Sequence, residues 1–231
     1  MRDILNEIIE LQAQYNASNT PAMNKRGTLI RNDLRDTLDE KRAILAQTLA
    51  IPEDDLIIEG RDGTGQKSKV PWTRLGSKLR APSANSGWYI VFLFRPQADG
   101  VYLCLSHAAT VWNGVDYVPR PETEMMPLMN WARALLADET ETNTWIQQID
   151  LDKANRLAAS YEKSTALAKF YDINSLPDNE TLTNDILGFA KALGKIYSQE
   201  DKGRSPNEAY QELEATQSQI RDGQSLSLIH I

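Results

Sequence analysis

The chain has 231 residues, of which 41% are hydrophobic and 25% charged, the proportions of a folded globular domain rather than a disordered chain. No apolar run approaches the roughly 18 residues of a membrane span. The N-terminal segment mixes acids with apolar residues at helical spacing, which excludes a secretory signal peptide. We therefore expect a cytoplasmic protein. The single cysteine, Cys104, excludes an internal disulfide and is best explained as a core residue of an apolar strand.

The net charge of −7 argues at first against a nucleic-acid partner. The charge is unevenly distributed, however. Residues 60–96 contain seven basic residues and one acid, so this stretch carries +6 and the remainder of the chain −13. A local basic stretch can contact phosphates on an acidic protein, because salt screens charges beyond about 8 Å. A solvated loop that is basic by chance is the alternative, and charge alone does not decide between the two.

Apolar spacing predicts a helix over residues 2–15 and, after the turn-forming segment NASNTP, a second helix from about residue 28 to 49. A short buried strand is predicted at 56–58, then the glycine loop GRDGTGQ at 60–66 and a strand at 69–75. A polar loop leads to the clearest β signal, WYIVFLF at 88–94 and the alternating VYLCLSHA at 101–108. These two segments predict adjacent antiparallel strands.

The second half of the chain predicts a helix at 125–137, a strand at 144–151 and helices at 153–170 and 181–198. This order predicts an α+β domain with a mixed, largely antiparallel sheet flanked by helices. We expect that domain to cover residues 1–198. Residues 199–231 are expected to form a polar linker with one short helix at 206–219. The terminal SLSLIHI resembles a translated sequencing adapter, so we expect a truncated chain that lacks a downstream module.

No constellation in the sequence predicts catalysis. The segment from Gly65 to Ser68 resembles a phosphate-binding loop, but Gln66 separates the glycine from the lysine and a strand follows instead of a helix. His107 lacks metal-ligand or catalytic partners, and His230 lies in the tail. The acids at 53–55 and at 150 and 152 fit helix caps or turns better than a carboxylate site. We expect neither an enzyme nor a cofactor or metal.

Aromatic residues lie near the basic stretch. Trp72, Trp88 and Tyr89 precede or begin the predicted hairpin, and Tyr161 and Tyr171 come later in the chain. Aromatics interleaved with bases suit a base-stacking pocket flanked by phosphate contacts. The residues alone favour the simpler interpretation that Trp72 and Tyr89 are core residues of strands.

The ordered motifs GTGQKSKVPWTRLG and SGWYIVFLFRPQADGVYLCLSHA closely resemble a family signature. It is that of the N-terminal DNA-recognition domain of McrB-type, modification-dependent (type IV) restriction enzymes. The signature consists of a glycine-rich loop, a Pro-Trp pair, a Gly-x-Tyr segment, a turn and an alternating strand. Downstream, ASYEKSTALAKFY and LPDNETLTNDILGFAKALGKIY look like the second half of the same family, so the resemblance covers residues 1–198.

The resemblance implies a phage-defence specificity domain that recognises modified cytosine in double-stranded DNA by base flipping. A downstream GTPase/ATPase motor or nuclease module would be its partner. Matching positions assign the base pocket to Trp72, Tyr89 and Leu93, with Tyr161 covering the other face of the base. The expected duplex-entering loop contains Gly63, Thr64 and Gly65, and Thr64 stands where the family has a larger, wedge-forming aromatic. The basic stretch supplies the expected phosphate contacts, which are Lys67, Lys69, Arg74, Lys78 and Arg80.

Two other functions stay open from the sequence. An interaction or scaffold domain that kept this fold but lost DNA binding is favoured by the net charge of −7 and by Thr64. The +6 stretch and the retained aromatics oppose it. A small-molecule or RNA-binding domain that uses the same pocket is the third interpretation.

Overall fold

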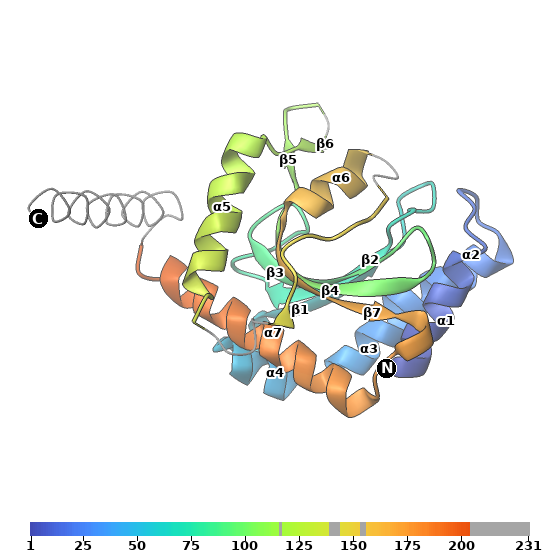
Figure 1. Cartoon of the computed structure of the whole chain (residues 1–231), viewed down its shortest axis with the longest axis horizontal. Helices are drawn as coiled ribbons and strands as arrows, with labels where there is room; N and C mark the ends of the chain where they lie inside the picture. Colours follow the sequence, from blue (N-terminus) through green and yellow to red (C-terminus); the bar gives the residue numbers. More distant parts are fainter. Residues whose placement is uncertain (116, 139–143, 153–155, 204–231) are drawn as a thin grey trace, which may run out of the picture.

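A computed structural model of the chain describes residues 1–115, 117–138, 144–152 and 156–203. Its central feature is a five-stranded sheet in the order β1-β2-β3-β4-β7, in which every neighbouring pair is antiparallel. Helices pack against the sheet, which confirms the predicted α+β class (Figure 1). Across the described ranges, no helix combines the length and the apolar character that a bilayer crossing needs. The predicted linker helix at 206–219 and the terminal tail lie outside the described residues.

The chain begins with helices on one face of the sheet. Helix α1 (Arg2–Gln12) buries Leu5, Ile8 and Ile9 on a single stripe. The predicted second helix begins earlier than expected and is divided into several elements. These are α2 (Pro21–Thr28), a π-helical turn (Leu29–Asp33), α3 (Leu34–Asp39) and α4 (Arg42–Leu49). Thr20 caps α2 by accepting a hydrogen bond from the Met23 backbone at 3.2 Å, next to a proline at the first turn. This N-cap explains the earlier start.

The strands are β1 (Leu56–Arg61), β2 (Trp72–Ser77), β3 (Trp88–Phe94), β4 (Gly100–His107) and β7 (Thr165–Asp172). Strands β3 and β4 form the predicted hairpin, with Val91 opposite Cys104. Strand β2 begins at Trp72 and not at residue 69, because Val70 and Pro71 lead into the sheet without pairing to β1. The register places Trp72 opposite Leu93 and Arg74 opposite Val91.

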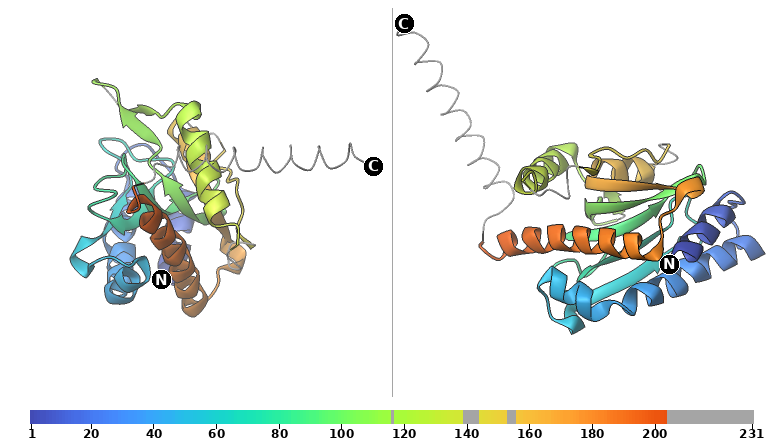
Figure 2. Two further views of the ribbon diagram at one scale, coloured as in Figure 1. Left: turned by 90° about the vertical axis from the view of Figure 1, so that its left-hand side faces the viewer. Right: turned by 60° about the horizontal axis from the view of Figure 1, so that its bottom comes forward.

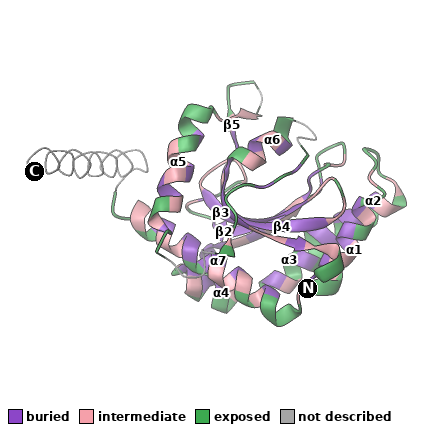
Figure 3. Ribbon diagram, in the orientation of Figure 1, coloured by how far each residue is buried: buried purple, intermediate pink, exposed green. Residues whose placement is uncertain are grey.

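Side-chain alternation gives the sheet two different faces. One face packs against α1, α3, α4 and the long helix α7 (Asn179–Glu200) and holds the larger core, which includes Ile90, Phe92 and Leu103. The other face holds a smaller cluster with Tyr89, Val91 and Leu93, and α6 (Arg156–Lys163) lies above it. Figure 2 shows α6 and α7 on opposite sides of the sheet, and Figure 3 shows burial concentrated in the strands between them. The second face is only partly covered.

Of two predictions for the second half, one was wrong and one was confirmed only in part. The expected strand at 144–151 makes a single bridge, between Ile146 and Ala168, and Trp145 stacks on Phe189 of α7 with ring centroids 3.8 Å apart. The helix expected at 153–170 is confirmed, within the described residues, over α6 alone, and β7 takes the place of its second part. Pairing of β7 with β4 outweighs the local helix preference of TALAKFYD, because strand formation depends on partners distant in the chain.

A small second sheet lies outside the predicted elements. Strands β5 (Thr110–Trp112) and β6 (Tyr117–Pro119) form a two-stranded ribbon that projects beyond α6 in Figure 1. Helix α5 (Glu122–Leu135) follows, three residues earlier than expected at its start. Three-residue strands carry too short a pattern to be found in the sequence.

Candidate functional site

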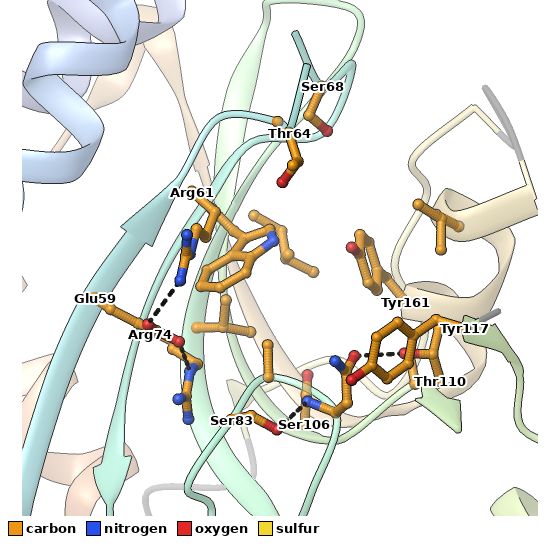
Figure 4. Close-up of a pocket in the computed structure, with 18 of the residues that line it drawn as sticks. Glu59, Arg61, Thr64, Ser68, Arg74, Ser83, Ser106, Thr110, Tyr117 and Tyr161 are labelled. Carbon is orange, nitrogen blue, oxygen red and sulfur yellow. Dashed lines mark hydrogen bonds and ion pairs between the residues drawn. The ribbon is translucent and has the colours of Figure 1, made fainter. Parts of the chain in front are cut away.

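A cavity of about 870 Å³ lies on the partly covered face of the sheet, below α6. Its floor is formed by side chains that alternate along β1, β2 and β3, and its sides by the loops 63–69 and 82–85, the ribbon and α6. Pockets of roughly 300–1,000 Å³ hold drug-sized ligands, so this cavity is large enough for a base with its sugar. Figure 4 shows Thr64 and Ser68 on one side of the opening and Tyr117 and Tyr161 on the other.

All four residues predicted for the base pocket line this one cavity: Trp72 on β2, Tyr89 and Leu93 on β3, and Tyr161 on α6. Tyr89 is fixed because its hydroxyl donates to the Ala84 carbonyl at 3.0 Å, and burial raises its pKa above the usual range. Burial also raises the pKa of Tyr161, against the opposing effect of a hydrogen bond with Trp72. The rings of Trp72 and Tyr161 come from positions 89 residues apart in the chain, and the fold brings them to one place.

The glycine loop borders the same cavity. Gly63 and Thr64 line it, and Gly65 lies at the next position with a φ of 76°. Gly63 has a φ of 121°, and a Cβ there would lie 2.0 Å from the carbonyl oxygen of Gln66. The left-handed backbone and the close approach both require glycine at position 63. The loop therefore has a defined shape close to the opening.

The base of the loop is held by a buried carboxylate. Asp62, 3% exposed in its side chain, pairs with Arg31 and with Lys67, whose Nζ lies 2.6 Å away. Burial alone would raise the pKa of Asp62, but the hydrogen bonds from Lys67 and Arg31 outweigh it and the pKa falls. The segment between α1 and α2 also holds the loop, since the Tyr15 hydroxyl donates to the Lys67 carbonyl at 3.0 Å.

The five expected phosphate contacts are in different environments. Lys67 and Lys69 line the cavity, Lys67 with a nearly buried side chain and Lys69 on an exposed residue. Arg74 is fully buried in the cavity wall. Lys78 and Arg80 lie outside the lining. Lys78 donates to the Asp54 carbonyl, and Arg80 pairs with Asp201 beyond the end of α7 at 2.7 Å. Most of the positive charge of residues 60–96 is therefore matched by acids within the fold.

One charged residue of the cavity was missed in the sequence. Glu59 on β1 lines it, and Figure 4 shows its carboxylate between Arg61 and Arg74. The β1–β2 register places Glu59 opposite Arg74 and Arg61 opposite Trp72, so these four side chains share one face. Alternation after residues 56–58 could have placed Glu59 away from the helix-covered core, but its partner depends on a strand register that spacing does not reveal.

The ribbon adds an aromatic border to the opening. Tyr117 of β6 lines the cavity, and its ring lies 5.2 Å from that of Trp112 in an edge-to-face arrangement. Both side chains are about half exposed, at 50% and 54%. No signal in the sequence distinguished these aromatics from others in loops.

The fold and the cavity define an α+β domain with an aromatic-walled pocket on the partly covered face of an antiparallel sheet. The chain belongs to the family of MrcB-like N-terminal domains, whose family model, "MrcB-like, N-terminal domain", matches residues 7–199. This confirms the family expected from the sequence motifs and supports a restriction-system context. No curated protein and no solved structure gave a significant match. In the described ranges, no group of three His, Cys, Asp or Glu residues could hold a metal ion.

Proposed function

We propose that this domain recognises modified cytosine in double-stranded DNA by accepting the extruded base into the pocket on the sheet. In this proposal the domain supplies specificity to a downstream motor or nuclease module and carries no catalytic role. The observation that carries it is the convergence of Trp72, Tyr89, Leu93 and Tyr161 on one open cavity beside the glycine loop. Family membership agrees with it.

The chemistry of the pocket suits a flat base. Aromatic side chains stack on either face of any base, each stacked ring contributing roughly 1–3 kcal/mol. Extrusion costs a few kcal/mol of pairing and stacking, so two opposed walls are needed to offset it. Trp72 and Leu93 belong to the sheet, whereas Tyr161 approaches from α6. Apolar walls also sense an added methyl group, because it fills space that water otherwise occupies.

Entry of the loop into the duplex is proposed for residues 63–65, at the edge of the opening. Thr64 is exposed and small, so it fills less of the gap left by the extruded base than an aromatic ring would. The anchored base of the loop offsets this in part, because a preformed loop loses little conformational freedom on binding. Phosphate contacts are proposed for Lys69 and, in addition, Arg61, whose side chain is 61% exposed beside the pocket.

Fluorescence anisotropy with three otherwise identical duplexes tests the proposal. They carry 5-methylcytosine, 5-hydroxymethylcytosine or cytosine at one position. We expect at least one modified duplex to bind more tightly than the unmodified one, and Trp72→Ala to remove the preference. Trp145→Ala is the matched control, because Trp145 stacks on Phe189 away from the pocket. Equal affinity for all three duplexes at low salt would overturn the proposal.

The interaction-domain alternative has one observation in its favour. Arg74, Arg80 and Lys67 are engaged with Glu59, Asp201 and Asp62, which leaves few free positive charges for phosphates. A domain of this kind would bind no duplex in the anisotropy experiment yet keep a normal melting transition.

A further inference from the structure

The cavity contains a carboxylate that an apolar base-stacking pocket does not require. The side chain of Glu59 is 26% exposed and lines the cavity. Burying a charged group is costly unless it is paired and hydrogen-bonded. A carboxylate kept at this position therefore needs an explanation either in the fold or in the ligand.

The fold accounts for one of the two carboxylate oxygens. Arg74 donates from Nε to Oε1 of Glu59 at 2.7 Å, and its side chain is 0% exposed. The same guanidinium donates to the Ala81 carbonyl at 2.9 Å and lies 5.4 Å from the centre of the Tyr89 ring. Arg74 is thus fixed from three sides, and it orients Glu59 relative to the aromatic wall.

The second oxygen, Oε2, has no such partner. Arg61 lies near it, with Nη2 at 3.7 Å, which is beyond hydrogen-bond distance. No other described donor is found for this oxygen. Oε2 therefore accepts no hydrogen bond from a described residue, within a pocket whose lining combines aromatic and small polar side chains with Lys67 and Lys69.

We propose that Glu59 is a specificity-determining residue that accepts a hydrogen bond from the exocyclic amino group of the extruded base, with Arg74 as its positioning residue. The inference rests on the proposed function and names the class of base that the pocket takes. A carboxylate pairs with the amino group of cytosine, a donor, and repels the keto oxygen that thymine and uracil carry at the same ring position. Aromatic walls stack on all pyrimidines alike, so Glu59 supplies the discrimination that stacking lacks.

Changing the base, with the protein unaltered, tests this directly. Two duplexes are compared by anisotropy, one with 5-methylcytosine and one with 5-methyl-2-pyrimidinone, which lacks only the amino group. Loss of a hydrogen bond to a charged group predicts about 10- to 100-fold weaker binding of the second duplex. The amine-less base pairs more weakly with guanine and is extruded more easily. Easier extrusion by itself would make the second duplex bind more tightly. Weaker binding of that duplex can therefore not be explained by extrusion.

The variant Glu59→Gln keeps the size of the side chain and an acceptor for Arg74 but turns an amide N–H₂ toward the base. We expect it to narrow the difference between the two duplexes to less than about threefold. Glu122→Gln is the matched control, because Glu122 is an exposed carboxylate paired with Lys163 at 2.7 Å outside the pocket lining. This control should keep the full difference.

The outcomes separate the two proposals. If the unaltered domain binds neither the 5-methylcytosine nor the 5-hydroxymethylcytosine duplex more tightly than the cytosine duplex, the proposed function fails and this inference falls with it. If it binds the 5-methylcytosine and 5-methyl-2-pyrimidinone duplexes equally, or if Glu59→Gln folds and keeps the full difference, only the role of Glu59 is overturned. The comparison of the two bases uses the unaltered domain, so it tests the role of Glu59 even if Glu59→Gln does not fold.

Discussion

At the scale of single residues, we predict that Tyr161 contributes to DNA recognition rather than to folding. Its ring forms the wall of the pocket on α6 and packs at the edge of the smaller core cluster. We expect Tyr161→Ala to weaken modified-DNA binding about 5- to 150-fold, the equivalent of one lost stacking contact. Leu103 is the matched control, because it is 0% exposed in the helix-covered core.

Leu103→Ala should lower the free energy of unfolding by about 2–5 kcal/mol, through lost burial and a cavity, without changing the affinity of the folded fraction. Thermal melts and binding curves on both variants distinguish the roles. Unfolding of Tyr161→Ala, or unchanged DNA binding by it, would make Tyr161 a core residue.

His107 provides a prediction on pH. Burial lowers its pKa from 6.5 to about 4, with a further contribution from Arg120, and its ring lies against Trp88 at 5.2 Å. Because the unfolded chain binds this proton at higher pH, the stability from neutral His107 is complete above about pH 6.5 and is lost toward pH 4. We expect the free energy of unfolding to fall by up to about 3 kcal/mol over this pH range.

Urea unfolding of the parent and of His107→Gln at pH 7 and pH 5 measures this contribution. The variant should lose less free energy of unfolding over that interval than the parent. The same pH dependence in both proteins would mean that His107 titrates normally in the folded state.

At the scale of elements, the glycine loop makes a matched comparison possible. Gly63 and Gly65 both have positive φ, but only at Gly63 would an added Cβ meet backbone, at 2.0 Å. Gly65→Ala should therefore cost about 1–2 kcal/mol of local backbone strain and leave the loop in place. Gly63→Ala must displace the chain at Gln66 and so alter the loop beside the pocket.

We expect Gly63→Ala to weaken binding of modified DNA clearly more than Gly65→Ala, as measured by anisotropy on proteins shown to be folded by circular dichroism. Equal effects of the two substitutions would show that the shape of the loop does not matter for binding.

The elements that the sequence predicted well are those with strong local patterns. Helix α1, the β3–β4 hairpin and the apolar repeat of α7 are examples. Residues 165–170 were predicted as helix because Ala, Leu and Lys favour helices, and only pairing with β4 makes them part of a strand. The strand predicted at 144–151 failed for the opposite reason. Trp145 stacks on Phe189 of α7, Ile149 and Leu151 belong to the smaller core cluster, and the segment pairs at one bridge alone.

At the scale of the whole molecule, charge along the sequence differs from charge on the surface. The +6 of residues 60–96 is reduced in the fold, because Arg80 and Arg95 pair with Asp201 and Asp99. Lys69 is exposed beside the pocket, whereas Arg80 lies outside its lining. Lys69→Gln should lower the salt slope of DNA binding by about one. Arg80→Gln should leave it unchanged.

Titration of binding from low to moderate salt checks this difference. A slope unchanged by Lys69→Gln would mean that Lys69 contacts no phosphate. An equal decrease of the salt slope in both variants would indicate that the electrostatic field of residues 60–96 as a whole attracts DNA, rather than a single phosphate contact.

The sequence predicted the four base-pocket residues of the candidate site and missed Glu59 and Tyr117. The family motifs named Trp72, Tyr89, Leu93 and Tyr161, and the fold brings these residues together. Glu59 and Tyr117 carry no motif, and they reach the cavity through the β1–β2 register and through the short ribbon. Arg74 was expected to contact phosphates but is buried and paired with Glu59. The charge of a basic stretch does not reveal which of its cations pair with acids inside the fold.

The central claim is that one nucleotide leaves the duplex and enters this pocket. The fluorescence of 2-aminopurine, placed next to the modified cytosine, measures it directly, because the probe brightens when its stacking neighbour is removed. We predict that the parent domain raises this fluorescence with a modified duplex, and that Trp72→Ala does so only weakly at saturating protein. Tight binding of the modified duplex without any rise in fluorescence would contradict the account, because the base would then be read without leaving the stack.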